Sequence, residues 1–367
     1  MINLRAPARP EELVGSLISE RFRLTRLLGS GGMGGVYAAV DDSGAPCAVK
    51  VVRGDLAGEE GSRRLVREGK LVSRLRDPHI VPVLESGYDT ARDLPFLVMP
   101  LLEGRDLARL LVETGALDPV IAVRLAIQAC KGLEEAHAAG IIHRDVKPQN
   151  LLLCEQPDGE VVLKVGDFGI AKRLEHFDDT QVTRTGRSMG SPAYMSPEQA
   201  KGDKELDQRT DIWSLGVTLY ELLSGKTPWG DSKNPSDLEA AIRGGRVPSI
   251  QELAPWVEPG LAKALHRALD RDREGRWPSA AVFAAELDAF AGGTCRVEAG
   301  TLRAIDAERT RAVAPPAEPR VTASLDAPAK RAPAQRTLLI LSVVGGIALA
   351  ILAVLFALLR SSGAAAP

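Results

Sequence analysis

A glycine-rich segment near the N-terminus could bring backbone amides close to phosphate oxygens. Residues 29–36 read GSGGMGGV and match the pattern GxGxxGxV, with Gly29, Gly31 and Gly34 at the glycine positions. Glycine has no Cβ, so its backbone can approach a phosphate closely. The pattern indicates a nucleotide site, with a tight turn or a linker as the alternative. A P-loop is excluded because neither GxxxxGKS nor GxxxxGKT occurs, and the strand-like segment 48–50 disfavours a dinucleotide fingerprint.

Two charged residues downstream are ambiguous by themselves. Lys50 ends the apolar run CAVK, where a lysine can simply extend its ammonium to solvent at a strand edge. Glu68 lies among several basic residues and could be one more solvated charge on a helix. Neither residue alone indicates a function.

Polar residues in two later segments carry more information. Asp145, Lys147 and Asn150 belong to HRDVKPQN, and Asp167 belongs to GDFGIAK, which follows an apolar run. With these residues the sequence resembles the protein kinase superfamily, and within it the bacterial serine/threonine kinases of eukaryotic (Hanks) type. The matching motifs in chain order are GSGGMGGVY, CAVK, HRDVKPQN, GDFGIAK, GSPAYMSPEQ and DIWSLG. Six motifs in this order are highly specific.

The resemblance implies a set of ATP contacts. The glycine-rich loop is expected to cover the phosphates and Val36 to pack on the adenine. Lys50 is expected to hold the α- and β-phosphates while it forms an ion pair with Glu68. The expected ATP-contacting residues are Gly29, Ser30, Gly31, Gly32, Met33, Gly34, Val36, Ala48, Lys50, Glu68, Met99, Leu102 and Leu152.

The resemblance also assigns the catalytic and metal-binding roles. Asp145 is expected to accept or orient the proton of the substrate hydroxyl, and Lys147 to steady the γ-phosphate. Asn150 and Asp167 are expected to coordinate Mg²⁺, for which Mn²⁺ could substitute, because oxygen ligands suit a hard cation that bridges phosphates. The implied cofactors are therefore ATP and Mg²⁺.

The segment from Ile170 to Ser191 corresponds to an activation loop. A polar surface loop is the alternative, but Arg144 precedes the catalytic aspartate, and in similar kinases this arginine receives a loop phosphate. Autophosphorylation is therefore expected at Thr183 or Thr185.

Two departures from the family pattern leave its chemistry intact. Pro100 stands after the gatekeeper Met99, where glutamate is usual, but proline keeps the carbonyl that the adenine amino group needs, and Leu102 can supply the hinge N–H. The triplet Ser-Pro-Glu that ends at Glu198 replaces Ala-Pro-Glu, and Glu198 is expected to pair with Arg276.

The elements that must position these residues suggest an α+β, bilobal kinase fold with one appended transmembrane helix. Residues 1–20 are interpreted as a lead, and 21–292 as the kinase domain. Strand-like apolar runs indicate a strand-rich N-lobe over about 21–102, and helical spacing indicates a helical C-lobe over 103–292. Proline- and alanine-rich residues 293–336 are interpreted as a flexible linker.

The C-terminal region contains a candidate membrane span. Residues 337–359 hold no charged residue and no proline, and as a helix they would extend for about 34 Å, enough for a hydrocarbon core. A buried core helix is the alternative. Basic residues are more frequent before the span than after it, which predicts a cell membrane protein with a cytoplasmic kinase domain and a short outer tail, 360–367. Ser342, Gly346 and Ala350 are spaced by four, so a homodimer through this helix is possible.

Composition limits the remaining function classes. Lys+Arg total 46 and Asp+Glu 48, so no overall positive charge points to a nucleic-acid partner. The 4 cysteines show no zinc-binding or disulfide pattern, which fits a reducing compartment. The expected partners are protein substrates with serine or threonine and the lipid bilayer. The alternatives are a pseudokinase scaffold, disfavoured by the intact catalytic residues, and a small-molecule phosphotransferase, disfavoured by the peptide-docking segment 190–198.

Overall fold

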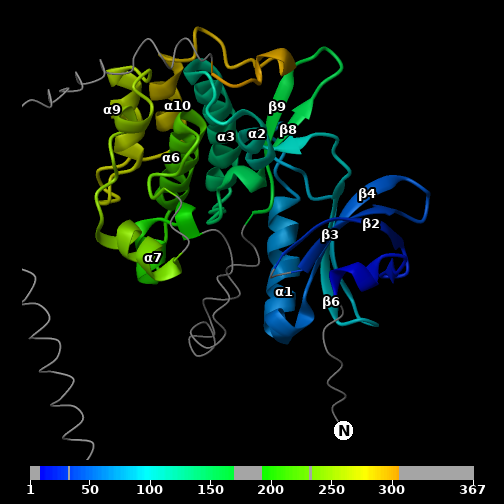
Figure 1. The fold of residues 1–367 in the computed structure, drawn as a ribbon. Helices are drawn as coiled ribbons and strands as arrows, with labels where there is room; N and C mark the ends of the chain where they lie inside the picture. Colours follow the sequence, from blue (N-terminus) through cyan, green and yellow to red (C-terminus); the bar gives the residue numbers. More distant parts are fainter. Residues whose placement is uncertain (1–8, 32–33, 169–191, 231–233, 306–367) are drawn as a thin grey trace, which may run out of the picture. The chain divides into compact units, whose positions relative to one another are not determined.

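The computed structural model of the chain describes residues 9–31, 34–168, 192–230 and 234–305 (Figure 1). Contacts divide the chain into residues 1–315 and 316–367, so every described residue belongs to the first unit. This unit has a strand-rich N-terminal lobe and a helical C-terminal lobe, as the sequence predicts.

The N-terminal lobe is a six-stranded antiparallel sheet with one helix packed against it. The strand order is β1-β2-β3-β4-β6-β5. The elements are η1 (Pro10–Leu13), β1 (Leu17–Ile18), β2 (Phe22–Gly31), β3 (Gly34–Val40), β4 (Pro46–Val52), α1 (Gly54–Val72), β5 (Glu85–Asp89) and β6 (Leu94–Pro100). The glycine-rich loop is thus the hairpin that joins β2 to β3.

The two faces of this sheet are covered by different elements, because side chains alternate along each strand. Phe96 and Val98 of β6 belong to a buried cluster with Val49 of β4. Leu97 points to the opposite face, toward α1. The helix approaches so closely that a Cβ at Gly69 would lie 2.6 Å from Cδ2 of Leu97, so only glycine allows this contact.

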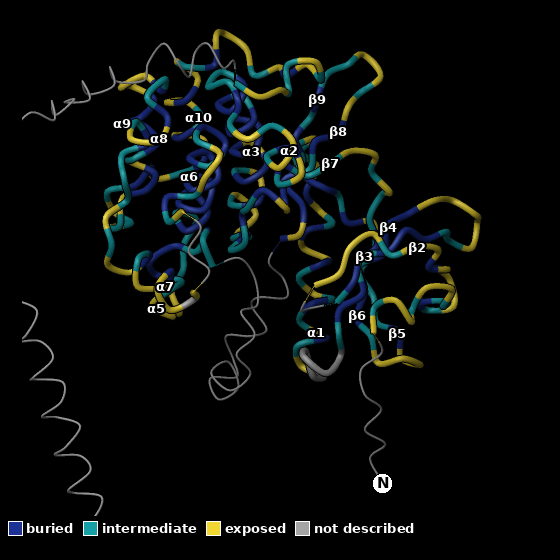
Figure 2. Tube along the Cα trace, viewed as in Figure 1, coloured by how far each residue is buried: buried dark blue, intermediate teal, exposed yellow. Residues whose placement is uncertain are grey.

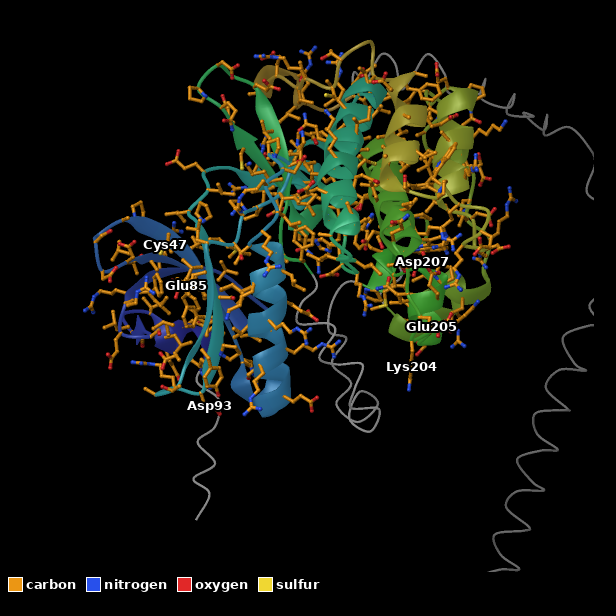
Figure 3. The ribbon with its side chains drawn as sticks, turned by 180° about the vertical axis from the view of Figure 1, so that it is seen from behind. Cys47, Glu85, Asp93, Lys204, Glu205 and Asp207 are labelled. Atoms are coloured by element: carbon orange, nitrogen blue, oxygen red, sulfur yellow. The ribbon has the colours of Figure 1, made fainter. Side chains whose placement is uncertain are left out.

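Residues of the predicted N-terminal lead, from residue 9 onward, pack on this lobe. β1 pairs with β2, and Ile18 is fully buried on the sheet face opposite α1. The backbone N–H of Ser19 donates to the buried carboxylate of Asp89 at 2.9 Å, and Arg21 donates to Glu85, which Figure 3 labels at the sheet surface. The few apolar residues of the lead have no clear period.

The C-terminal lobe consists of helices around a small antiparallel sheet of order β7-β8-β9. Its strands are β7 (Arg105–Asp106), β8 (Leu151–Glu155) and β9 (Val161–Val165). Its helices are α2 (Leu107–Thr114), α3 (Pro119–Ala138), η2 (Pro148–Asn150), η3 (Pro192–Tyr194), α5 (Pro197–Lys201), α6 (Arg209–Ser224), α7 (Pro235–Gly244), α8 (Ile250–Leu253), α9 (Pro259–Ala268), α10 (Ala280–Asp288) and η4 (Ala299–Thr301).

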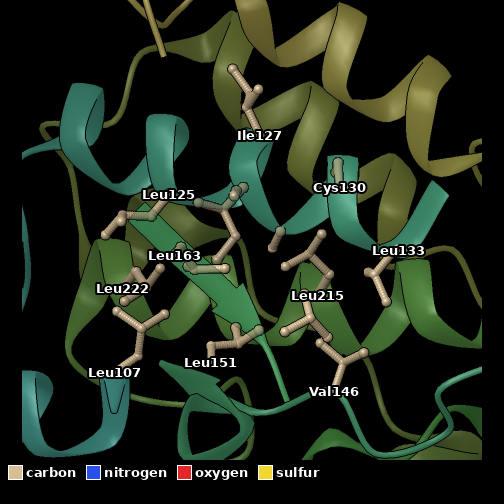
Figure 4. Packing of buried hydrophobic residues seen from close by; sticks show 14 of the residues in the cluster. Leu107, Leu125, Ile127, Cys130, Leu133, Val146, Leu151, Leu163, Leu215 and Leu222 are labelled. Carbon is tan, nitrogen blue, oxygen red and sulfur yellow. The ribbon is translucent and has the colours of Figure 1, made fainter. Parts of the chain in front are cut away.

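The core of this lobe lies around α3 and α6. Leu125 and Leu133 of α3 pack in one buried cluster with Leu163 of β9 and Leu215 of α6 (Figure 4). Residues 210–220 of α6 are all buried, and Figure 2 shows α6 as one of the most continuously buried elements. A helix buried on all sides is a rigid support for the loops that contact it.

The chain continues to pack on the C-terminal lobe beyond residue 292, so the first residues of the stretch interpreted as a linker contact this lobe. Val297 is fully buried, and its carbonyl accepts from the N–H of Val161 at 2.8 Å. Gln128 donates to the carbonyl of Cys295 at 2.9 Å, and the N–H of Ile305 donates to Ala116 at 3.0 Å. These contacts are mostly to backbone atoms, which leave little trace in side-chain patterns.

Within the described ranges, no helix is both long and apolar enough to cross a membrane. The predicted span 337–359, the tail 360–367 and linker residues 306–336 lie outside the described residues. The membrane span therefore stays a prediction.

Candidate functional site

The segment between α3 and β8 brings together three of the residues singled out in the sequence. Lys147 Nζ lies 2.8 Å from Oδ2 of Asp145, and both side chains are about 15% exposed. Asn150 Nδ2 donates to the backbone carbonyl of Asp145 at 2.7 Å and to its Oδ2 at 3.1 Å. The carboxylate of Asp145 is therefore held in a defined orientation while it remains partly accessible.

A buried carboxylate on α6 fixes the backbone of this segment. Asp211 is fully buried, and its two oxygens accept from the backbone N–H groups of His143 at 2.8 Å and Arg144 at 2.7 Å. His137 Nε2 also lies 2.8 Å from Asp211 Oδ2. Hydrogen bonds to a charged acceptor are stronger than neutral ones, so this contact ties the segment firmly to the core.

His143 connects the segment to the chain after β9. Its Nδ1 accepts from the N–H of Asp145 at 3.2 Å, which leaves Nε2 as the donor to the carbonyl of Gly166 at 2.9 Å. The imidazole also packs on Phe168, with ring centroids 4.8 Å apart. The segments that carry Asp145 and Asp167 are therefore held in register by one buried side chain.

Two residues of the site adopt a left-handed backbone conformation that is uncommon for residues other than glycine. Arg144 has φ 65° and Asp167 has φ 57°. Such conformations cost roughly 1–3 kcal/mol and persist where the surroundings impose them, often at functional sites. The hydrogen bond that the backbone N–H of Arg144 donates to Asp211 supplies one such constraint.

The structure gives Lys50 a different partner from the one expected. Its ammonium forms an ion pair with the carboxylate of Asp167, and its side chain is 15% exposed. Glu68 pairs with Arg64 at 3.1 Å instead. Arg64 is one turn earlier on α1, a spacing that favours such pairs on a helix. The expected ion pair between Lys50 and Glu68, both described residues, is thus a wrong prediction for this conformation.

Strand register places several other expected nucleotide contacts beside Lys50. Val36 of β3 lies opposite Lys50 of β4, and Ala48 lies opposite Met99 of β6. Side chains two residues apart on a strand share a face, so Ala48 and Lys50 project to the same side of the sheet. Leu102 is the second residue after β6 and is partly exposed.

The remaining expected residues are only partly described. Gly29, Ser30 and Gly31 are exposed at the end of β2, and Leu152 of β8 is partly exposed. Gly34 has φ 141°, and a Cβ there would lie 2.0 Å from the carbonyl oxygen of Val51, so this position requires glycine. Gly32, Met33 and the expected phosphorylation sites Thr183 and Thr185 lie outside the described residues.

Oxygen donors suited to a hard divalent cation are present. The amide nitrogen of Asn150 is used for Asp145, so its carbonyl oxygen is the atom left for a ligand. The Asp167 side chain is 45% exposed, with one oxygen paired to Lys50. No group of three or more His, Cys, Asp and Glu residues that could hold a metal occurs in the described part of the chain. This donor set fits Mg²⁺, which uses one or two carboxylates plus substrate phosphates.

A buried ion pair supports the segment after the expected activation loop. Glu198 receives two hydrogen bonds from Arg276, at 2.7 and 2.8 Å, and a third from Thr210 at 2.9 Å. Burial alone would raise the pKa of Glu198, but the hydrogen bonds and charge of Arg276 outweigh it, so the pKa is lowered. The predicted pair is confirmed.

Sequence reasoning missed His143 and Asp211, which hold the backbone of the site through hydrogen bonds. Neither His143 nor Asp211 was assigned a role, although both lie in quoted motifs, HRDVKPQN and DIWSLG. The available signal was the position of Asp211 beside a run of apolar residues on a helix. A buried aspartate needs a partner, so this position indicated a structural role.

Comparisons with known proteins agree with this geometry. Residues 22–285 match the family described as protein kinase domain. The chain is 35% identical over 309 residues to the serine/threonine-protein kinase pkn3 of Myxococcus xanthus, covering 83% of this chain and 56% of that protein. It is 36% identical over 286 residues to the serine/threonine-protein kinase PknL of Mycobacterium tuberculosis, covering 77% of this chain and 68% of that protein.

A solved kinase-domain structure has a similar fold. The crystal structure of the PknI kinase domain of Mycobacterium tuberculosis superposes with a TM-score of 0.59 at 26% identity, covering 76% of this chain and 99% of that chain. The chain spans between 39% and 56% of the length of several curated relatives, pkn3 among them.

Proposed function

Because the chain belongs to the protein kinase family, we propose that it transfers the γ-phosphate of ATP to serine or threonine hydroxyls of proteins. The observation that carries the proposal is the arrangement of Asp145, Lys147 and Asn150, held in hydrogen-bond contact next to Asp167. The names of the relatives, all serine/threonine-protein kinases, support the choice of acceptor.

The acceptor hydroxyl is oriented by Asp145 in this proposal. Its carboxylate is fixed by Asn150, so it can accept a hydrogen bond from the hydroxyl without first reorganising. It takes the proton as the bond between the hydroxyl oxygen and the γ-phosphorus forms and the bond from the γ-phosphorus to the β,γ-bridging oxygen breaks, with ADP as the leaving group. Lys147, 2.8 Å away, brings a positive charge to the side where the transferred phosphoryl group carries negative charge. Most of the catalysis is positioning and charge stabilisation.

ATP is held mainly by the N-terminal lobe in this proposal. Lys50 contacts the α- and β-phosphates, Val36 and Ala48 border the adenine, and Met99 and Leu102 line the hinge. When bound, Mg²⁺ supplies positive charge that offsets the phosphates, with Asn150 and Asp167 as its protein ligands.

We also propose that residues 337–359 anchor the protein in a cell membrane with the kinase domain in the cytoplasm. The support is the length of the uncharged run and the excess of basic residues before it. Autophosphorylation at Thr183 or Thr185 and dimerisation through Ser342, Gly346 and Ala350 belong to the same proposal. Cysteines introduced on either side of the run, labelled in sealed vesicles by an impermeant reagent, test the orientation.

Phosphate transfer by the full chain in lipid nanodiscs tests the activity. We expect labelled ATP with Mg²⁺ to label serine and threonine residues in the wild type, and neither Asp145→Asn nor Lys50→Met to do so. Asp158→Asn is a matched control, because Asp158 is an exposed partner of Arg296 outside the site. ATP binding without transfer in any condition would favour a scaffold, and label on small molecules alone would favour a different phosphotransferase.

A further inference from the structure

Tyr37 of β3 is a fully buried tyrosine whose hydroxyl has a backbone partner far away in sequence. The hydroxyl donates to the carbonyl of Pro10, the first residue of η1, at 2.8 Å. Burial, with a smaller contribution from the negative charge of Glu11, raises the pKa of Tyr37 to about 12. The hydroxyl therefore stays protonated and remains a donor at all physiological pH values.

The ring of Tyr37 lies over Gly35, two residues earlier on the same face of β3. A Cβ at Gly35 would lie 2.7 Å from the hydroxyl oxygen and 2.9 Å from Cζ of the ring. Gly35 is not left-handed in the structure, so its glycine is required by the ring and not by its backbone angles. The aromatic ring thus points along the strand toward the glycine-rich hairpin.

Gly34, the residue before Gly35, is confined by the backbone of the neighbouring strand β4. A Cβ at Gly34 would lie 2.0 Å from the carbonyl oxygen of Val51, so the backbone of β4 leaves no room for a side chain at this point. Gly34 and Gly35 pair with Gly31 and Ser30 of β2. The first two residues of β3 after the turn are therefore confined, Gly34 by the backbone of β4 and Gly35 by the ring of Tyr37.

We propose that η1 and Tyr37 form a clamp that sets the position of the glycine-rich hairpin over the nucleotide site. Pro10 fixes the hydroxyl of Tyr37, the ring fixes Gly35, and Gly35 adjoins the loop that is expected to contact phosphates. Tyr37 is a positioning residue, since its side chain lies on the sheet face opposite Lys50. The proposal rests on the proposed function, because it assumes that the hairpin binds ATP.

Ordinary core packing makes a different prediction from the clamp. If Tyr37 only filled space with Ile18, Phe22 and Val49, loss of its hydroxyl would lower stability without a local effect on the hairpin. If it is a clamp, loss of the hydroxyl alone frees the hairpin and weakens nucleotide binding at temperatures where the protein is fully folded.

The first test compares Tyr37→Phe with Tyr88→Phe in the full chain. Tyr88 lies in the same sheet, and its hydroxyl donates to Asp93 in the β5–β6 turn, so the control also removes one tyrosine hydroxyl bond. We expect the Kd and KM for MgATP to rise about three- to tenfold in Tyr37→Phe, which corresponds to one hydrogen bond, with kcat within twofold. Tyr88→Phe should leave both constants unchanged.

Hydrogen exchange without nucleotide separates the clamp from the proposed function. We expect the amides of Gly31, Gly34 and Val36 to exchange faster in Tyr37→Phe than in the wild type, and those of Val49 and Val98 to stay protected. Unchanged exchange in the hairpin overturns the clamp, whatever the ATP result. Failure of the wild type to bind MgATP overturns the proposed function, while the exchange result still decides the clamp.

A pair of substitutions tests the contact between the ring and the glycine. Gly35→Ala should displace the ring and raise the Kd for MgATP at least as much as Tyr37→Phe. In a Tyr37→Leu background, which leaves space over position 35, Gly35→Ala should have little further effect. Equal effects of Gly35→Ala in both backgrounds would contradict the clamp, because two independent sites add.

Discussion

The two lobes hold their functional residues in different ways. In the C-terminal lobe, Asp145 sits on a segment whose backbone is bonded to Asp211, and the next segment is held through His143. In the N-terminal lobe, Lys50 and Glu68 are held by side-chain ion pairs with Asp167 and Arg64.

This difference separates fixed groups from groups that can exchange partners. Moving Asp145 would break the hydrogen bonds that the backbone N–H groups of His143 and Arg144 donate to the buried carboxylate of Asp211. Breaking such bonds is costly in a low-dielectric interior. Moving Lys50 breaks a side-chain ion pair whose carboxylate, on Asp167, is 45% exposed. We infer that the C-terminal lobe supplies a preorganised reaction centre and that the N-terminal lobe adjusts to the nucleotide.

The largest expected effect is on the reaction centre itself. Asp145→Asn should lower kcat by about 10²–10⁴, because the amide cannot take the proton of the hydroxyl. The Kd for MgATP, measured by calorimetry, should stay within about threefold of the wild-type value. A variant with near-normal kcat and lost ATP affinity would break the division of roles between the lobes.

The next effect concerns the buried support of the C-terminal lobe. Glu198→Gln leaves the guanidinium of Arg276 buried without a countercharge, so the free energy of unfolding should fall by about 3–5 kcal/mol. Chemical denaturation measures this loss. Glu274→Gln, which alters an exposed partner of Arg209, is the control and should leave the free energy of unfolding nearly unchanged.

Acid should reduce the difference between the wild type and Glu198→Gln. The pKa of Glu198 is lower in the folded protein than in the unfolded chain, so its contribution is fully present above the ordinary carboxyl pKa. It is lost as the pH falls through the folded pKa, below that ordinary value. Denaturation curves from pH 7 to pH 3 should therefore converge, and a constant gap would mean that charge is not the cause.

The smallest effect is expected in the N-terminal lobe. Asp89 accepts from the N–H groups of Ser19 and Arg92, at 2.9 and 3.0 Å. Asp89→Asn keeps an acceptor for one of them and should cost about 1 kcal/mol in unfolding free energy. The kcat of the folded variant should be unchanged. A loss of kcat as large as that of Asp145→Asn would mean that the two lobes are not separable.

The sequence motifs located most of the site but not its conformation. The segments with Asp145, Asn150 and Asp167 were identified through motifs that resemble those of protein kinases, and the residue types in them suit the implied chemical roles. The partner of Lys50 was not predictable, since two carboxylates, Glu68 and Asp167, compete for one ammonium. That competition depends on tertiary distances that residue types do not encode.

The segments at both ends of the described fold are harder to recognise from sequence patterns than its centre. The lead around Ile18 and the segment around Val297 pack through a few apolar residues and many backbone hydrogen bonds. Patterns of apolar residues detect helices and strands that bury a whole face, and neither segment does so.

The packing of residues 293–305 also bears on where this protein can be shortened for production. The family match stops at residue 285. A fragment that ends there would lack the carbonyl of Cys295 that accepts from Gln128, and it would expose the apolar residues against which Val297 packs. Such a fragment should form inclusion bodies or precipitate on concentration, whereas one that ends after Ile305 retains both contacts and should remain in solution.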